Sequence, residues 1–335
     1  MTIHDFDTSW IIPQFSDIES REEDVDVSTQ LGPLHLNLPI ISANMKSVTG
    51  PSMAVAMKEH GGLGILHRIN STQEAVDDFK KANSTENYVG RDLPSDPFNW
   101  AGVSLGVKDE DKKRFDDLYE AGAKIFNIDV AHGHHILVKR MIEYIQNKNL
   151  ADVVIIAGNI ATADGARDLF DWGAHIIKVG IGPGFACITR RNTGIGVPQL
   201  YAIERIREKY SMPLIADGGA RNVCDIAKAL AAGADAVMIG AILAGTAETP
   251  GKVYPDDKED LVNRTFYKVY GGSSSAQIKG KNRFVEGRVQ IVPFKGHVKY
   301  ILKEIKEGLQ SSFSYVGARN IKEYREKSKF LEINE

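Results

Sequence analysis

Short apolar runs that alternate with amphipathic segments constrain this chain more than any other feature of its sequence. Eight such runs are predicted to be strands, and several are continuously hydrophobic, as expected for parallel strands buried on both faces. Each run is followed by a stretch with helical periodicity. This arrangement favours an α/β fold with a closed (β/α)8 barrel, the TIM barrel, over an open sheet. The expected strands are residues 38–42, 63–66, 101–105, 124–129, 153–157, 175–180, 213–217 and 236–240.

Three Gly-Ala pairs support the barrel. They begin at Gly122, Gly173 and Gly233, and each lies where a predicted helix ends and an apolar strand follows. Glycine adopts the left-handed conformation that commonly terminates a helix, so these positions predict helix C-caps. Their shared context makes chance recurrence the weaker explanation.

Size and charge restrict the class of protein. A chain of 335 residues could form two domains or one large barrel, and because no separate domain is visible, we expect residues 1–335 to form a single barrel. The net charge of −3 argues against a nucleic-acid or anionic-membrane partner. No apolar run approaches the roughly 20 residues of a spanning helix, and the first residues lack a signal-peptide pattern. We therefore expect a soluble cytoplasmic protein.

One of the two cysteines lies in a glycine-rich loop, GIGPGFACITRRNTGIGVPQ, which spans residues 180–199. A cysteine on a polar loop is a candidate nucleophile, because loops carry function and thiolates are reactive. The alternative for Cys187 is a small buried apolar residue, and we favour the nucleophile. Cys224 lies in a helix-periodic segment, so we expect it in the core. The two cysteines predict no disulfide framework.

Small residues follow the seventh and eighth predicted strands. Asp217, Gly218 and Gly219 follow the seventh, and Gly240 and Ala241 follow the eighth. Glycine lets backbone N–H groups approach an anion closely, as in the phosphate sites of barrels. The sequence therefore predicts a phosphate cradle here, with the Asp217 carboxylate placed to accept hydrogen bonds from ribose hydroxyls.

Polar residues also end the fourth and fifth predicted strands. Asp129 and Asn159 would face the same barrel mouth, and the Asn159 amide suits a carboxamide such as that of nicotinamide. A structural role, in which the Asn159 side chain caps the loop, is an equally good explanation for this residue. The following segment AHGHH is histidine-rich, but no carboxylate or thiolate set with zinc spacing accompanies it, so we do not favour a metal there.

A glycine-rich, basic segment at residues 270–288 is predicted to be a mobile flap. It contains Glu286, while Thr189 lies two residues after Cys187. A hydroxyl bonded to a carboxylate can relay protons. The alternative is that Glu286 is a solvated flap residue.

The chain resembles the IMP dehydrogenase / GMP reductase family, and within it the reductases, over nearly its whole length. The motifs that carry the resemblance are SANMKSVTG, NIDVAHGH, AGNIAT, KVGIGPGFACITRRNTGIGVPQL, ADGGARN, VYGGSSS, VEGR and SYVGARN. The cysteine-loop motif is highly specific.

The resemblance implies a reaction and its catalytic residues. Cys187 would add to C2 of a purine mononucleotide, GMP, to form a thioimidate, while Thr189 and Glu286 handle the protons of the leaving amine. Hydride from NADPH, with NADH or NAD as alternatives, would then give IMP. The resemblance further implies a homotetramer and a monovalent cation, potassium, held by backbone carbonyls of Gly182, Gly184 and Cys187.

It also implies the ligand contacts. Substrate contacts fall on Asp217, Gly218, Gly219, Gly240, Ala241, Gly271, Gly272, Ser273, Arg283 and Gly287. Cofactor contacts fall on Arg68, Asp129, Val130, Ala131, Asn159, Ser314 and Tyr315, joined by Ser20 and Arg21 of a neighbouring subunit.

Two features favour reductase over dehydrogenase. The dehydrogenases insert a pair of CBS modules after the second strand, and this chain has no room for them. They also carry an Arg-Tyr pair in a long flap, where this chain has Arg283-Phe284 in a short one. An IMP dehydrogenase without CBS modules, converting IMP to XMP with NAD, is one alternative; a non-catalytic purine-nucleotide-binding barrel is another.

The chain departs from the family at two places. Phe185-Ala186 replaces a serine that contacts the phosphate, so phosphate binding depends more on backbone N–H groups. Lys46 replaces the aspartate of the ANMD motif.

Overall fold

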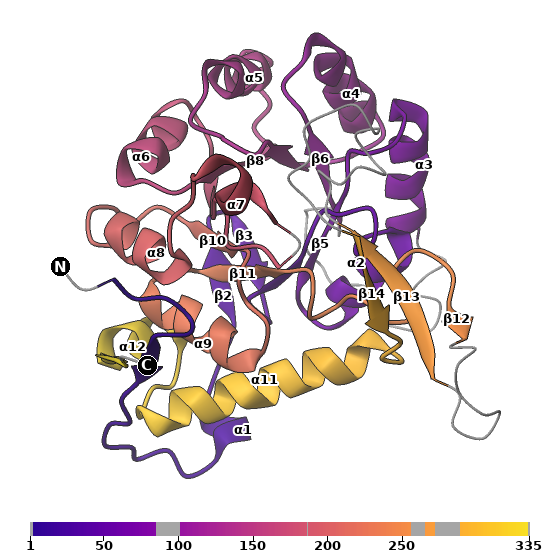
Figure 1. Cartoon of the computed structure of the whole chain (residues 1–335). Helices are drawn as coiled ribbons and strands as arrows, with labels where there is room; N and C mark the ends of the chain where they lie inside the picture. The colour runs from indigo at the N-terminus through magenta and orange to yellow at the C-terminus, as the bar shows by residue number, and fades with distance from the viewer. Residues whose placement is uncertain (1–2, 85–100, 186, 256–264, 272–288, 334–335) are drawn as a thin grey trace.

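The centre of the protein is a closed barrel of eight parallel strands (Figure 1). We describe a computed structural model over residues 3–84, 101–185, 187–255, 265–271 and 289–333. Each of the eight predicted runs overlaps one barrel strand, with β8 extending three residues beyond its predicted end, so the TIM-barrel prediction is confirmed. The strands are β4 (Ile40–Ser42), β5 (Leu63–Leu66), β6 (Ala101–Leu105), β7 (Ile125–Asp129), β8 (Val154–Ile160), β9 (Ile176–Val179), β10 (Leu214–Asp217) and β11 (Ala236–Ile239).

Amphipathic helices surround the barrel because each buries one apolar stripe against the strands. In α5, for example, the buried residues Val138, Met141, Ile142 and Ile145 recur at helical spacing. The outer helices are α2 (Pro51–Glu59), α3 (Thr72–Ala82), α4 (Asp109–Glu120), α5 (Ile136–Gln146), α6 (Ala163–Asp171), α8 (Gln199–Arg207), α9 (Val223–Ala232) and α11 (Val298–Tyr315).

The three predicted glycine caps are confirmed. Gly122, Gly173 and Gly233 have φ angles of 103°, 109° and 121°, in the region that residues with a Cβ rarely adopt. Each glycine follows a helix, α4, α6 or α9, and leads the chain into the next barrel strand.

An apolar hairpin closes the amino-terminal end of the barrel. Strands β2 (Thr29–Leu31) and β3 (Leu34–Leu36) pair in antiparallel fashion and lie behind the barrel in Figure 1. Their leucines form one buried cluster with the inward-facing residues of the barrel strands. That cluster contains Leu31, Leu34, Leu36, Ile41, Ala43, Leu63, Ile65, Ile125, Val154, Ile156, Ile176, Ile215, Ala236 and Met238.

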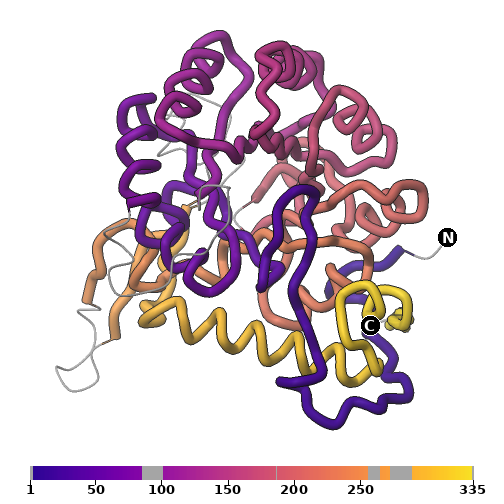
Figure 2. The backbone as a smooth tube through the Cα atoms, turned by 180° about the vertical axis from the view of Figure 1, so that it is seen from behind, coloured from indigo at the N-terminus to yellow at the C-terminus, as the bar shows by residue number. Residues whose placement is uncertain are grey.

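The ends of the chain lie together outside the barrel (Figure 2). Strand β1 (Ser9–Ile11) pairs antiparallel with β15 (Phe330–Glu332). The short helix α1 (Arg21–Asp24) lies below α11 in Figure 1, and α12 (Ile321–Lys327) follows α11.

A three-stranded sheet adjoins the barrel and holds both ends of the predicted flap. It consists of β12 (Tyr254–Pro255), β13 (Phe266–Gly271) and β14 (Val289–Pro293). Tyr270 and Gly271 belong to β13, and Tyr270 is only 3% exposed, so the segment begins as a packed strand and not as a flap. Residues 272–288 lie outside the described residues.

The stretch between β5 and β6, residues 67–100, holds no CBS modules; its described part contains α3. No helix among the described residues combines the length and apolar character needed to cross a bilayer. The expectation for Cys224 is wrong, because this residue is exposed. It is the second residue of α9, whose buried face begins at Asp225 and Ile226.

Candidate active site

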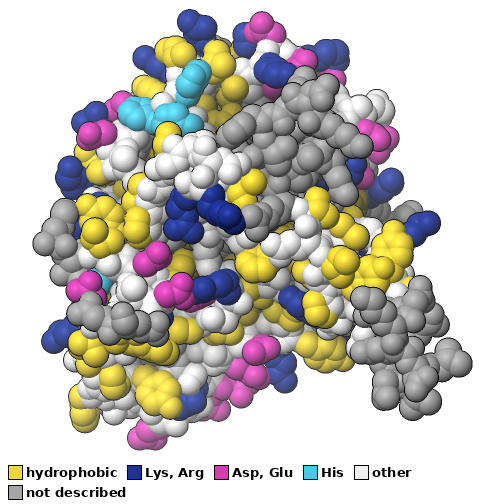
Figure 3. Space-filling view, in the orientation of Figure 1, with side chains coloured by type: hydrophobic (Ala, Val, Ile, Leu, Met, Phe, Trp, Pro, Cys, Tyr) yellow, Lys and Arg dark blue, Asp and Glu magenta, His cyan; other side chains and the backbone are white. Residues whose placement is uncertain are grey.

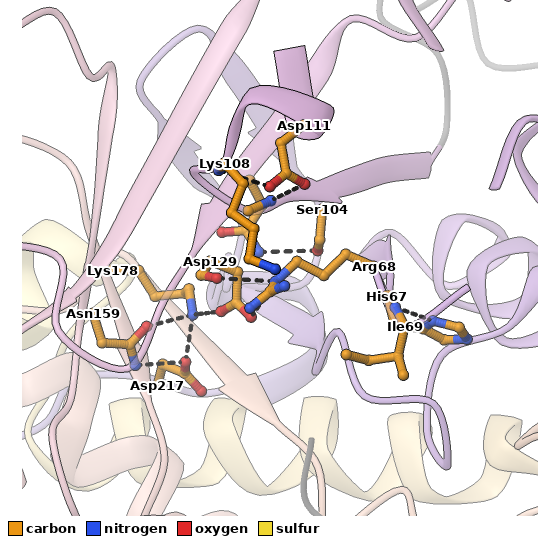
Figure 4. Close-up of polar contacts among 12 residues, drawn as sticks. His67, Arg68, Ile69, Ser104, Lys108, Asp111, Asp129, Asn159, Lys178 and Asp217 are labelled. Atoms are coloured by element: carbon orange, nitrogen blue, oxygen red, sulfur yellow. Dashed lines mark hydrogen bonds and ion pairs between the residues drawn. The ribbon is translucent and has the colours of Figure 1, made fainter. Parts of the chain in front are cut away.

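The inner lining of the barrel changes from apolar to polar toward the carboxyl ends of the strands. Ile125 lines the apolar end of β7, and Asn127 and Asp129 follow it at alternate positions. In the same way Lys178 follows Ile176 on β9, and Asp217 follows Ile215 on β10. Since alternate residues of a strand share a face, these polar side chains point into the barrel mouth (Figure 4).

Lys178 connects three strand ends at the mouth. Its side chain is 1% exposed, and Nζ lies 2.9 Å from Asp129 Oδ1 and 2.8 Å from Asp217 Oδ2. Nζ also donates to Asn159 Oδ1 (Figure 4). The sequence analysis missed this residue, although a lysine inside the apolar strand IIKV was the available signal. A buried lysine is found almost only where it is paired.

The opposite charges favour the ionised forms of Asp129 and Lys178. Burial by itself would raise the pKa of Asp129, but the Lys178 ammonium, with Arg68 nearby, holds that pKa below its ordinary value. Burial by itself would lower the pKa of Lys178, but the carboxylates of Asp129 and Asp217 raise it. The mouth therefore holds one buried ammonium group between the side chains of Asp129 and Asp217.

The amide of Asn159 serves the protein network. Its Nδ2 donates to Gly180 O at 2.8 Å and to Asp217 Oδ2 at 2.9 Å, and its Oδ1 accepts from Lys178. Both hydrogens of the Asn159 amide are therefore used within the protein. This differs from the expectation that the amide is free to bind a ligand carboxamide such as that of nicotinamide. Asn159 instead orients Asp217.

Only one of the two Asp217 carboxylate oxygens takes part in this network. Oδ2 accepts from Lys178 and Asn159, while Oδ1 has no hydrogen-bond partner within the part of the chain that the structure describes. Among the predicted cofactor residues, Arg68 Nε donates to Asp129 O at 3.1 Å and lies 3.9 Å from Asp129 Oδ2. Val130 pairs with the β8 backbone, and Ala131 is exposed beside it.

The Cys187 loop holds the thiol next to a hydroxyl. Cys187 Sγ lies 3.1 Å from Thr189 Oγ1, and Cys187 N donates to Gly184 O at 2.9 Å. Thr189 is the first residue of α7 (Thr189–Thr193), which lies over the mouth in Figure 1. The thiol is half-buried, so the alternative of a fully buried apolar cysteine does not hold.

Glycines let this loop contact the turn after β10. A Cβ on Gly180 would lie 1.9 Å from Asp217 O, and one on Gly218 would lie 3.2 Å from Gly184 N. Gly218 and Gly219 also have positive φ angles. The cysteine loop and the predicted phosphate turn are therefore packed together as one surface.

The amino-terminal segment braces the same turn. A Cβ on Gly219 would lie 2.8 Å from Phe6 Cε2, and Phe6 O accepts from Lys228 Nζ at 2.8 Å. Arg221, two residues after Gly219, pairs with Asp7. No motif in the sequence indicated this support.

Strand β13 closes the other side of the site. The Tyr270 and Phe185 ring centroids are 6.4 Å apart, and a Cβ on Gly240 would lie 3.2 Å from Tyr270 Oη. Burial raises the pKa of the Tyr270 phenol, which stays neutral. Ser47 Oγ lies 3.1 Å from both Gly271 N and Gly271 O.

Further hydrogen bonds hold the turn after β11. The carbonyl of Ala241 accepts from Lys295 Nζ at 3.2 Å. The structure thus gathers the Cys187 loop, the Asp217 turn, Gly240, Ala241 and Gly271 around one mouth. Gly272, Ser273, Arg283, Glu286 and Gly287 lie outside the described residues.

Four predicted cofactor residues form a separate cluster at the end of α11. The Arg21 guanidinium lies 5.3 Å from the centroid of the Tyr315 ring, and its Nη1 donates to Ser311 Oγ at 2.9 Å. Ser20 caps α1, and Ser314 is buried with its hydroxyl bonded to Ser311 O. In Figure 1 this cluster lies away from the mouth of its own barrel.

Two histidines of the AHGHH segment bond to neighbouring protein groups. His134 Nε2 lies 2.9 Å from Asp168 Oδ2, and His135 Nδ1 accepts from Leu137 N at the start of α5. Within the described ranges, no three His, Cys, Asp or Glu residues are grouped to hold a metal ion. Gly182 is buried with a φ of 93°, and Gly184 O accepts from Cys187 N; the cation site on these carbonyls stays a prediction.

Exposed basic side chains lie near the mouth, with acidic side chains beside some of them (Figure 3). Figure 3 shows Lys and Arg side chains near the centre of this face, where α7 lies in Figure 1. Arg190 and Arg191 of α7 are exposed. Such a patch attracts anions by long-range electrostatics.

Comparisons with known proteins show to which family this chain belongs. A GMP reductase of Lactobacillus gasseri is 39% identical over 331 residues, 97% of this chain and 93% of that protein. A GMP reductase of Oenococcus oeni is 38% identical over 329 residues, 97% of this chain and 95% of that protein. The model of the IMP dehydrogenase / GMP reductase domain matches residues 3–335. This chain belongs to the IMP dehydrogenase / GMP reductase family.

Proposed function

We propose that this protein is a GMP reductase, which converts GMP to IMP and ammonia at the expense of NADPH. The observation that carries the proposal is the Cys187 thiol, held 3.1 Å from the Thr189 hydroxyl on a loop packed against the Asp217 turn. The relatives named above as GMP reductases match nearly the whole chain, which supports the same activity.

The mouth suits a purine mononucleotide. Asp217 Oδ1 would accept hydrogen bonds from the ribose hydroxyls, because Lys178 and Asn159 already hold Oδ2. Backbone N–H groups of Gly218, Gly219, Gly240 and Ala241 would bind the phosphate, since glycine allows close approach there. The exposed arginines of α7 favour arrival of the dianion.

Cys187 would act as the covalent nucleophile. Its thiolate attacks C2 of the purine, a C2–S bond forms, and the C2–N bond of the amine breaks. Thr189, next to the sulfur, and Glu286 would deliver the proton that lets ammonia leave. The thiolate then departs as C2 gains hydrogen, which yields IMP and restores Cys187.

The cofactor face would be the Asp129 edge of the mouth. NADPH supplies the hydride when bound. The ionised Asp129, beside Arg68 and the exposed Ala131, offers an acceptor for ribose hydroxyls there. The cluster of Ser20, Arg21, Ser314 and Tyr315 lies away from its own mouth and would serve a neighbouring barrel of a homotetramer. A potassium ion would bind the Gly182, Gly184 and Cys187 carbonyls.

An absorbance assay at the nicotinamide band tests the proposal. With GMP and NADPH we expect the absorbance to fall, with stoichiometric release of ammonia. With IMP and NAD, which an IMP dehydrogenase without CBS modules would use, we expect no increase. A rise with IMP and NAD, or no change in either mixture beside measurable GMP binding, contradicts the proposal.

A further inference from the structure

The strongest unassigned feature is the ammonium group of Lys178. A lysine has three N–H donors, and all three are used by Asp129, Asn159 and Asp217. With its side chain 1% exposed, Lys178 has neither a free donor nor open surface for a ligand. Its effect on any ligand must therefore pass through these three partners.

The two carboxylates belong to different halves of the site. The proposed function places the ribose of GMP at Asp217 and the cofactor at Asp129, and Figure 4 shows both carboxylates beside the Lys178 ammonium. Each has an oxygen within 2.9 Å of the same nitrogen, so they are close neighbours of like charge. Two carboxylates in such a site repel each other, and without a cation one of them takes up a proton.

Other groups around the carboxylates cannot replace the lysine. Arg68 lies 3.9 Å from Asp129 Oδ2 and bonds chiefly to the Asp129 carbonyl. Tyr270, on β13, is neutral and buried. The side chain of Asn44, from the loop after β4, also bonds Asp129 and carries no charge.

We propose that Lys178 is a positioning residue that holds Asp129 and Asp217 both ionised and both oriented, so that one buried ammonium prepares the substrate half and the cofactor half together. This inference rests on the proposed function. It assigns Lys178 no contact with substrate, cofactor or reacting atoms.

The test is the pH dependence of ligand binding by Lys178→Met, which keeps an unbranched side chain one heavy atom shorter and removes the charge. All proteins carry Cys187→Ala, so that no thiol ionises in the site and no turnover occurs. Calorimetry gives the Kd of GMP and, separately, of NADP+ from pH 7 to 9, above the second phosphate pKa of about 6. The reference protein should bind both ligands with a Kd that hardly changes with pH.

In Lys178→Met we expect both Kd values to rise about 30-fold at pH 7. Because the shared proton leaves at higher pH, we expect at least about fivefold recovery by pH 9. A lysine that only supported packing would not give recovery with pH. Unchanged Kd values at pH 7, or weakened binding that stays flat to pH 9, overturn the inference.

Two further variants serve as a control and as a second test. Lys268→Met removes another buried ammonium, whose Nζ contacts the carbonyls of Thr246 and Thr249, and its pH profile should match the reference. If Lys178→Met does not fold by circular dichroism, Lys178→Arg decides. The charge of the arginine should keep the Kd values independent of pH. Its planar guanidinium cannot reproduce the geometry of the ammonium, so the Kd of each ligand should rise about threefold or more. Kd values equal to those of the reference protein overturn the inference.

The outcomes separate the two proposals. If the reference protein binds no GMP, the proposed function fails and the inference falls with it. If the reference binds GMP and NADP+ normally but the Lys178 variants behave like it, only the inference fails.

Discussion

The two ends of the barrel are lined by the same strands and yet have opposite chemistry. At the amino-terminal end, the hairpin leucines and the inward isoleucines form a dry cluster. Two residues further along β9 and β10, the inward positions are Lys178 and Asp217. The apolar end supplies burial, the dominant favourable term in folding, and needs no directional contacts. The polar end is stable only because each buried charge has a partner.

This contrast shows how a barrel can carry a reactive site without losing its core. The β2–β3 hairpin fills the end where no ligand is expected. The mouth instead uses glycine contacts and the Phe6 brace to hold loops that have little apolar surface of their own. Changes at the two ends should therefore affect different measurements.

The largest expected effect is on activity, at the mouth. Cys187→Ala removes the proposed nucleophile and should lower the proposed turnover of GMP with NADPH by about 10⁴-fold or more. GMP binding should stay measurable, because the Asp217 turn is unchanged. Cys224→Ala, which alters the exposed cysteine of α9, is the matched control and should keep full activity. A Cys187→Ala protein with wild-type turnover rules out covalent catalysis.

The next effect is on stability, at the closed end. Leu31→Ala leaves a cavity at a side chain with 0% exposure, which should cost about 2–5 kcal/mol of unfolding free energy. Thermal unfolding measures the loss, and kcat/KM below the unfolding range should change less than about twofold.

Asp217→Asn is the matched variant at the mouth and should show the reverse pattern. It removes a charged acceptor, so kcat/KM for GMP should fall about 10- to 100-fold. If Leu31→Ala impairs catalysis as strongly as Asp217→Asn, the separation between the two ends does not exist.

The smallest effect concerns pH and His67, which follows β5 at the mouth. Burial, with the charge of Lys46, lowers the pKa of His67 to about 4 from 6.5. The unfolded chain therefore takes up a proton that the folded chain refuses, and stability falls as the pH drops from about 6.5 toward 4. This single group should cost about 1 kcal/mol between pH 6.5 and 5.5.

His67→Asn tests this contribution of His67 to the pH dependence of stability. The amide oxygen of the new asparagine can accept the hydrogen bond from Ile69 N that His67 Nδ1 accepts in the wild type. Denaturant unfolding at pH 6.5 and 5.5 should show the variant losing about 1 kcal/mol less than wild type. An equal loss in both proteins would mean that His67 does not titrate as stated.

Local pattern was sufficient for the barrel and for part of its mouth. Short apolar runs, several of them continuous, identified all eight strands because parallel strands buried on both faces are rich in hydrophobic residues. Gly122, Gly173 and Gly233 were identifiable because a left-handed helix cap excludes most other residues. Cys187 and Asp217 were candidates because they lie in glycine-rich turns at predicted strand ends, and the structure packs these two turns together; their roles stay predictions.

Other features depended on distant contacts. Cys224 was misplaced because helical periodicity does not say which side of the first turn meets the barrel. Asn159 appeared free for a ligand, and only its contacts with Gly180 and Asp217 show that its amide hydrogens are used. The Phe6 brace joins the first residues to a turn more than two hundred positions later, a pairing that no local pattern contains.

The sequence by itself determined the barrel, its helix ends and the loop that carries the thiol, because each follows from the conformational or solvation preferences of neighbouring residues. The tertiary structure decided what Lys178 does. A lysine among isoleucines is unfavourable until β7, β8 and β10 bring Asp129, Asn159 and Asp217 to its three hydrogens. That compensation comes from separate strands, so it exists only once the barrel has closed.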